Sequence, residues 1–201
     1  RRMETQPQVK DRNYIITDPP VVDRMFGSTR WAWVWLIPRL YIGYTWLDSG
    51  LGKIGNPAWM QTGEALRGFW TNAVRIPDAP ARPAIAFDWY RNFIQSMLDA
   101  QAYTWFGKLV PIAEVLVGIA LLLGAFVGVA AFFGAFMNWN FMMAGTASIN
   151  PLMFAITILL ILAWKNAGWV GLDRWLLPLL GTPWRPGRVF SEREVESARR
   201  T

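Results

Sequence analysis

Ionisable and amide side chains stand inside the most apolar stretches of this sequence, where such groups are rare and chemically informative. The four inside these stretches are Arg39, Glu114, Asn138 and Asn140, and Asp48 and Lys53 follow further along the first stretch. A charged group at the centre of a bilayer costs a few kcal/mol unless it is paired or solvated. These positions therefore indicate either ion pairs that hold helices together or a site that binds a proton or a substrate.

Glu114 has two candidate partners. On a helical wheel Arg39 and Lys53 share one face with Trp46, whereas Asp48 lies about opposite Arg39 and is a poor partner for it. With a rise of about 1.5 Å per residue, Arg39 and Glu114 differ by about 9 Å in depth, a gap that two long side chains can span. Lys53 reaching back from the end of its helix is equally compatible with Glu114. Both pairings stay open, as does the choice between a structural ion pair and a functional site.

The two asparagines point in different directions. Asn138 and Asn140 are about 200° apart on a helix, so they cannot share a face. A buried amide without a partner is costly. We therefore expect one of them to form a hydrogen bond within the helices and the other to face a partner or a cavity.

The sequence contains no cysteine and no histidine among its 201 residues. Without cysteine there is no disulfide, no thiolate nucleophile, no zinc ribbon and no iron–sulfur cluster of the usual kind. Without histidine there is no ordinary haem ligand and no imidazole base. We therefore expect no haem, no iron–sulfur cluster and no metal, so any chemistry relies on carboxylates, Lys, Arg, amides, hydroxyls and aromatic rings.

The distribution of charge predicts the elements that position these groups. Residues 115–164 contain no Asp, Glu, Lys or Arg, and as one helix they would be far longer than a hydrocarbon core of about 30 Å. Breaks at residues 124–128 and 145–151 divide this run. We expect an all-α integral membrane four-helix bundle, with spans over residues 31–52, 106–124, 127–144 and 150–168.

Basic residues concentrate at the two ends of the chain, with six before residue 31 and seven from Lys165 onward. Because Lys and Arg are retained on the cytoplasmic side, we predict a multi-pass protein of the inner (plasma) membrane with both termini cytoplasmic. The net charge of +6 then reflects topology and anionic lipid. No motif points to nucleic acid, and none is expected as a partner.

This topology divides the chain into three parts. Residues 1–30 form a cytoplasmic polar tail, residues 31–173 form the membrane domain, and residues 174–201 form a cytoplasmic interfacial strap and charged tail. The membrane domain includes a long external loop over about residues 53–104. Apolar spacing predicts amphipathic helices in this loop over residues 59–70 and 87–98, separated by a proline-rich turn over residues 77–83. We also expect a short surface piece over residues 175–180.

Short motifs in the first two predicted spans carry a resemblance to a known family. The first span has Pro38-Arg39-Leu40-Tyr41-Ile42-Gly43 and ends on Gly50-Leu51-Gly52-Lys53-Ile54, and the second has Phe106-Gly107, Glu114, Gly118 and Leu121-Leu122-Leu123-Gly124. Together with Gly171-Leu172-Asp173, this pattern resembles the DoxX/DoxD family of four-helix membrane proteins over about residues 31–173.

The resemblance implies redox work at a quinone. DoxD-type members form the membrane subunit of a thiosulfate:quinone oxidoreductase, which joins two thiosulfates to tetrathionate and passes the electrons to a quinone. They associate with a second subunit, DoxA. By this resemblance quinone is the expected substrate, and the expected partners are the lipid bilayer and other membrane-complex subunits, including a DoxA-like subunit.

Site residues for such a reaction are assigned from the available side chains. Glu114 is the candidate proton acceptor or donor and forms, with Arg39, the candidate catalytic pair. The quinone is expected against the first span, and its candidate binding residues are Lys53, Trp46, Tyr44, Asn138 and Asn140. A thiosulfate dianion is expected to be gathered by external basic residues, namely Lys53, Arg67, Arg75, Arg82 and Arg91.

Two other functions stay open. The first is a non-catalytic structural or accessory subunit of a larger respiratory or photosynthetic membrane complex, which the cofactor-poor composition, long tails and many aromatic residues favour. The second is a transporter, which is less favoured because the sequence has no internal repeat and no obvious broken helix apart from the one at Pro38.

Overall fold

The computed structural model of the chain describes residues 18–181, and within this range it contains helices and no strand. The predicted all-α class is confirmed for these residues. In chain order the elements are α1 (Pro20–Gly27), η1 (Thr29–Trp31), α2 (Ala32–Ile54), α3 (Pro57–Met60), α4 (Glu64–Val74), α5 (Asp88–Asp99), α6 (Tyr103–Leu123), α7 (Val127–Met143), α8 (Asn150–Leu162) and α9 (Asp173–Leu179).

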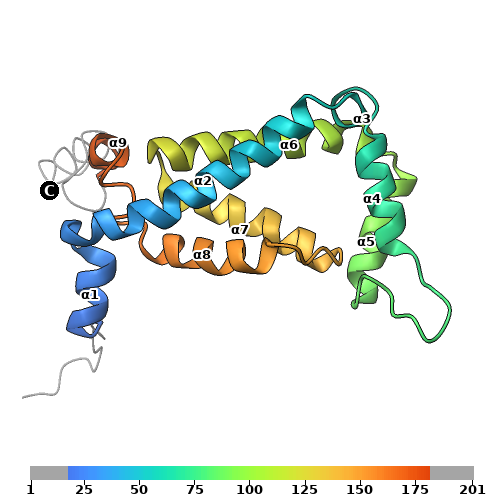
Figure 1. Cartoon of the computed structure of the whole chain (residues 1–201), viewed down its shortest axis with the longest axis horizontal. Coiled ribbons are helices and arrows are strands. Elements are labelled where there is room, and N and C mark those ends of the chain that lie inside the picture. Colours follow the sequence, from blue (N-terminus) through green and yellow to red (C-terminus); the bar gives the residue numbers. More distant parts are fainter. Residues whose placement is uncertain (1–17, 182–201) are drawn as a thin grey trace, which may run out of the picture.

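Four helices, α2, α6, α7 and α8, run lengthwise beside one another, as Figure 1 shows. Helix α2 packs on α6 and α8, and α7 packs on α6 and α8, so the four helices form a closed group. Helices α4 and α5 lie across one end of this group, and α1 and α9 lie at the other end. These ends are named the α5 end and the α9 end below.

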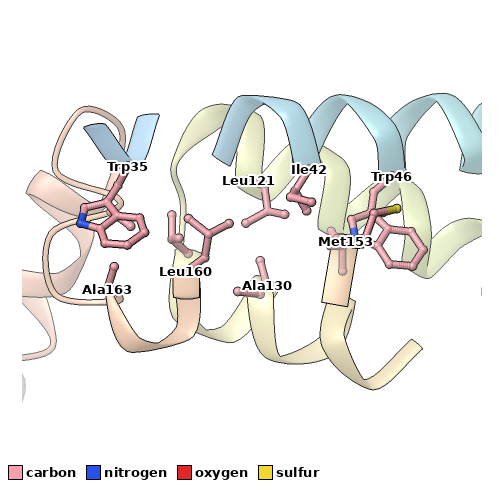
Figure 2. Packing of buried hydrophobic residues seen from close by; sticks show 12 residues of the cluster. Trp35, Ile42, Trp46, Leu121, Ala130, Met153, Leu160 and Ala163 are labelled. Atoms are coloured by element: carbon pink, nitrogen blue, oxygen red, sulfur yellow. The ribbon is translucent and has the colours of Figure 1, made fainter. Parts of the chain in front are cut away.

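Buried apolar side chains from all four long helices meet along the middle of this group. Figure 2 shows Trp35, Ile42 and Trp46 of α2 together with Leu121, Ala130, Met153 and Leu160 of the other three helices. A second buried cluster lies at the α5 end, where α4 and α5 pack against the start of α6 through Leu66, Trp70, Tyr90 and Ile94. Helices α4 and α5 are therefore anchored to the long helices by a core of their own.

Glycines bring α2 and α6 into close contact. A Cβ atom at Gly118 would lie 2.6 Å from the backbone N of Leu47, and one at Gly50 would lie 3.0 Å from the carbonyl oxygen of Pro111. Neither position has room for a side chain, which is how small residues let two helix backbones approach. Of the side chains that the helical wheel places on one face of α2, Arg39 and Trp46 are buried and Lys53 is partly exposed.

Among residues 18–181, one helix, α6, is long and apolar enough to cross a membrane by length and composition. The apolar helices α7 and α8 have 17 and 13 residues, or about 26 Å and about 20 Å at the usual rise, which is shorter than a hydrocarbon core of about 30 Å. Helix α8 ends at Leu162 rather than at the predicted Gly168. The chain continues in turns over residues 163–172, and two carbonyl oxygens of this segment accept hydrogen bonds from the Arg39 side chain.

The segment between α2 and α6 contains three helices, α3, α4 and α5, where the sequence predicts two. The expected helix over residues 59–70 is instead split into α3 and α4, because Gly63 has a left-handed backbone with φ of 74°. The second predicted helix corresponds to α5, and residues 77–83 are not helical. Helix α1 falls within the predicted polar tail over residues 1–30 and was not itself predicted, and α9 covers most of the predicted surface piece. The strap after residue 181 and the charged tail lie outside the described residues.

Candidate functional site

The side chains of Lys53, Glu114 and Ser49 form one hydrogen-bonded group at the α5 end. The Lys53 Nζ donates to both carboxylate oxygens of Glu114, at 2.7 Å from Oε1 and 2.6 Å from Oε2. It also donates to Ser49 Oγ at 2.7 Å, and the Ser49 hydroxyl donates to Glu114 Oε2 at 3.2 Å. The Glu114 side chain is 0% exposed and the Lys53 side chain is 22% exposed. The carboxylate is therefore enclosed, and the ammonium group is the member of the pair that reaches the surface.

Local helix geometry produces this group. Ser49 and Lys53 are four residues apart on α2, so their side chains lie on the same side of the helix. Gly50 lies between Ser49 and Lys53 and has no side chain. Helix α2 can therefore approach α6 closely at Pro111, which lies one turn before Glu114. The Lys53 Nζ lies 5.5 Å from the ring centroid of Trp59 on α3, a cation–π contact that holds the ammonium over the pair.

A cavity of about 500 Å³ lies beside the ion pair, within the range typical of small-molecule sites. Both Lys53 and Glu114 line it. Aromatic walls come from Trp46, Trp59, Phe69 and Phe141, and further polar groups come from Thr45, Asp48, Thr146, Ser148 and Asn150. We name it the polar cavity. An ammonium donor, a carboxylate and flat aromatic walls suit a planar molecule that carries carbonyl or hydroxyl oxygens.

Arg39 is not part of this site, and the alternative pairing of Arg39 with Glu114 is wrong. Arg39 and Lys53 are 14 residues apart on one helix, which is about 21 Å along its axis. The Arg39 guanidinium instead donates to the carbonyl oxygens of Ala167 and Val170, at 2.8 Å each. The difference in depth between Arg39 and Glu114 left this pairing possible, because the sequence does not show how far one helix is shifted along the other.

The α9 end holds a second polar group, built mostly from bonds to the backbone. The Asp173 carboxylate accepts from the backbone N–H groups of Phe126 and Val127 at the start of α7. The Asn166 amide donates to the carbonyl oxygens of Met25 and Ser28, which ties the segment after α8 to α1. We name Arg39, Asp173 and Asn166 the backbone-bonded cluster.

Three of the other predicted binding residues lie outside the polar cavity. Tyr44 is 64% exposed on the outer side of α2. Asn138 is 0% exposed and neither atom of its amide has a hydrogen-bond partner in the described part of the chain. Asn140 donates to the carbonyl oxygen of Phe136 and accepts from the Tyr90 hydroxyl. The prediction that the two asparagines face different ways is confirmed, but the amide that forms hydrogen bonds is that of the half-buried Asn140, and the fully buried Asn138 amide has no partner among the described residues.

The arginines expected to gather an anion also lie outside the lining of the polar cavity. Arg67 pairs with Glu64 and Arg91 pairs with Asp88, both one turn away on the same helix. Of the basic residues expected to gather an anion, Lys53 alone lines the cavity.

Several cavity residues were missed in the sequence. Ser49 has a usable signal, since it lies four residues before Lys53. Trp59, Thr146, Ser148 and Asn150 have none, because they are brought to the cavity by the turn before α4 and by the turn between α7 and α8. Within residues 18–181 no group of three acidic side chains is close enough to hold a metal ion.

Comparisons of the chain with models of protein families, with curated proteins and with solved structures find no match. The chemistry of the site therefore follows from its own geometry.

Proposed function

We propose that this chain is a quinone-linked redox subunit of the inner membrane, of the thiosulfate:quinone oxidoreductase type. In this proposal α2, α6, α7 and α8 form a four-helix membrane bundle, and the polar cavity receives the quinone ring. The observation that carries the proposal is the ion pair between the fully buried Glu114 and the partly exposed Lys53 on the wall of an aromatic cavity. A buried, charged pair is a costly arrangement for stability alone, which makes a chemical role the better explanation.

The outward surface of the four helices supports a membrane location. Large apolar side chains are exposed along α6, α7 and α8, among them Leu116, Ile119, Phe132, Phe133 and Leu159. Such a continuous apolar exterior is unfavourable in water and matches a lipid environment. The helices shorter than the hydrocarbon core are extended by the turns that follow them, and the bilayer can thin locally around short spans.

The reaction balances without a resident metal or haem. Two thiosulfate dianions each give up one electron and join through a new S–S bond to give tetrathionate. The quinone takes the two electrons and two protons and becomes the quinol. The polar cavity must then let donor and quinone meet, or a partner subunit must deliver the electrons.

Each charged residue has a defined part in this reaction. The Lys53 ammonium donates a hydrogen bond to a quinone carbonyl and attracts the developing negative charge. Glu114 holds a proton within reach of that oxygen and passes it on as the quinone is reduced. Trp46 and Phe141, whose ring centroids lie 6.4 Å apart, offer flat surfaces for the ring.

The direct test is thiosulfate-dependent reduction of a short-chain quinone by the full chain, alone and with its neighbouring subunits purified from native membranes. We expect quinone reduction that depends on thiosulfate and yields tetrathionate. No reduction in either preparation would overturn the proposal. Recovery of the chain solely as a tightly held, inactive part of a larger assembly would favour the accessory-subunit alternative.

The membrane topology has its own test, because the natural chain contains no cysteine. Single cysteines at two exposed positions, Ala81→Cys in the loop after α4 and Val21→Cys in α1, are labelled with a membrane-impermeant maleimide in intact cells. We expect label at position 81 in intact cells and at position 21 only after permeabilisation. Label at both positions in intact cells would contradict the predicted cytoplasmic amino terminus.

A further inference from the structure

A second cavity, of about 190 Å³, lies at the α5 end between the external helices and the bundle. Its walls come from α4, α5, α6 and α7, and representative lining residues are Trp70, Ile94, Met97, Val110 and Met137. We name it the apolar cavity. It has room for roughly six water-sized groups, at about 30 Å³ each.

The lining of the apolar cavity is almost entirely hydrocarbon, and both of its polar side chains already have hydrogen-bond partners. Its two polar side chains, Tyr90 and Asn140, bond to each other and to the backbone: the Tyr90 hydroxyl lies 3.1 Å from both the side-chain and the backbone oxygen of Asn140. The Asn140 amide donates to the carbonyl oxygen of Phe136. A cavity lined in this way stays dry and takes apolar guests.

The two cavities are neighbours with a shared wall. Phe69 of α4 and Phe141 of α7 line both the polar cavity and the apolar cavity. Both side chains are half-buried. A molecule with its head beside Lys53 therefore has hydrocarbon-lined space directly behind these two rings.

The far side of the apolar cavity reaches the outer surface of the bundle. Phe93 of α5 and Phe136 of α7 line the cavity and are about half exposed. They belong to the same apolar exterior that we assign to lipid contact. A tail that leaves the protein here enters the hydrocarbon rather than water.

We propose that the apolar cavity binds the hydrocarbon tail of the molecule whose head occupies the polar cavity, so that the site selects a tailed amphiphile that enters from the membrane. The inference rests on the proposed function for the identity of the head, a quinone ring. The polar half provides a cation, a carboxylate and aromatic walls. The apolar half provides a dry channel that passes between the external helices and the bundle.

The test compares two quinones with the same ring, one with a decyl tail and one without a tail. Binding to the full chain in lipid nanodiscs is followed by tryptophan fluorescence quenching. Val110→Phe, on α6, fills the apolar cavity, and Met97→Trp fills it from the opposite wall on α5. Val129→Phe is the matched control, because Val129 lies exposed on α7 outside both cavities.

We expect both filling variants to weaken binding of the tailed quinone at least tenfold and to change binding of the tailless quinone less than twofold. The control should change neither. Far-ultraviolet circular dichroism and a thermal melt verify that each variant is folded. Two filling variants on different helices are used so that one remains if the other does not fold. Equal affinity of wild type and both folded variants for the tailed quinone would overturn the inference.

A photoreactive group at the end of the decyl tail gives an independent readout. We expect label on α5 or α7 residues around the apolar cavity, and loss of that label in Val110→Phe. Label confined to the outer lipid-facing surface would mean that lipid chains fill the cavity and would overturn the inference. Failure of the proposed function looks different: the tailed quinone binds and labels the apolar cavity, but thiosulfate does not reduce it.

Discussion

At the α9 end the Arg39 guanidinium donates to two backbone carbonyls, whereas at the α5 end the Lys53 ammonium donates to other side chains, those of Glu114 and Ser49. Arg39 and Lys53 both belong to α2, the helix that packs on α6. In the backbone-bonded cluster, loss of a side chain leaves main-chain groups without partners. In the Lys53–Glu114 pair, the bonds join side chains that line a cavity and can exchange partners with a ligand.

This difference separates a structural use of buried charge from a chemical one. The course of the backbone fixes the positions of the main-chain groups that Arg39, Asp173 and Asn166 bond to. The Arg39 side chain of this cluster also packs against Gly124, where a Cβ atom would lie 2.7 Å from Arg39 Nη1. Gly124 has φ of 67°, so a glycine is favoured there on both counts. The α5 end has no comparable backbone bonds to its charged pair. We infer that the α9 end determines stability and that the α5 end determines activity.

Arg39→Met should give the largest effect on stability. It leaves the carbonyl oxygens of Ala167 and Val170 unpaired and Asp173 without its nearby cation, at a cost of about 3–5 kcal/mol. Thermal unfolding in detergent measures the loss. Arg67→Met is the matched control, since Arg67 is exposed and its pair with Glu64 on the surface contributes less than about 1 kcal/mol. Equal stability of the two variants would contradict the inference that the α9 end determines stability.

Glu114→Gln should show the opposite pattern, a large loss of activity with a smaller loss of stability. The amide keeps the shape of the carboxyl group but cannot hold a transferable proton, so quinone reduction should fall about 10²–10⁴-fold. Glu64→Gln, a surface change outside the polar cavity, should retain the wild-type rate. If Glu114→Gln unfolds as readily as Arg39→Met, the pair at the α5 end is structural and the assigned role is wrong.

Gly118→Ala tests the close contact between α2 and α6, the two helices that run between the two ends. Its new methyl group would lie 2.6 Å from the backbone N of Leu47, and overpacking of this kind costs about 1–3 kcal/mol. Gly68→Ala on α4 is the matched control, because nothing lies within 4 Å of its Cβ position. That control should be neutral or more stable by up to about 1 kcal/mol. A neutral Gly118→Ala would show that α2 and α6 are less closely packed than described.

Tyr90 gives the smallest effect, and its readout is a titration. Burial raises the pKa of Tyr90 to about 12 from its usual 10.0. As the pH rises, the Tyr90 hydroxyl therefore loses its proton in the unfolded chain first. The contribution of the protonated Tyr90 to the free energy of unfolding is lost between about pH 10 and about pH 12. The absorbance of tyrosinate, measured as the difference between wild type and Tyr90→Phe, should show a midpoint about two pH units above an exposed tyrosine. A midpoint near 10 would mean that the apolar cavity is open to water.

Helical periodicity alone predicted which side chains share a face, as for Arg39 and Trp46 on α2 and for the diverging Asn138 and Asn140 on α7. The partner of Glu114 was not predictable in this way, because it depends on how far α6 is shifted along α2. That shift is set by contacts such as Gly118 on Leu47, which involve both helices. Ser148 and Asn150 were missed for a similar reason, since the turn between α7 and α8 brings them to the polar cavity. The end of α8 at Leu162 was also not predicted, and the segment that follows it is bonded to Arg39, far away in the sequence.

The central claim is that the Lys53–Glu114 cavity holds a quinone and that Arg39 serves the fold. The most direct measurement is an experimental density map of the chain in a complex purified from native membranes with an excess of a tailed quinone. We expect a flat density in the polar cavity beside Lys53 and Glu114, continuing past Phe69 and Phe141, and no ligand at Arg39. An empty polar cavity with the quinone bound beside Arg39 would contradict the account.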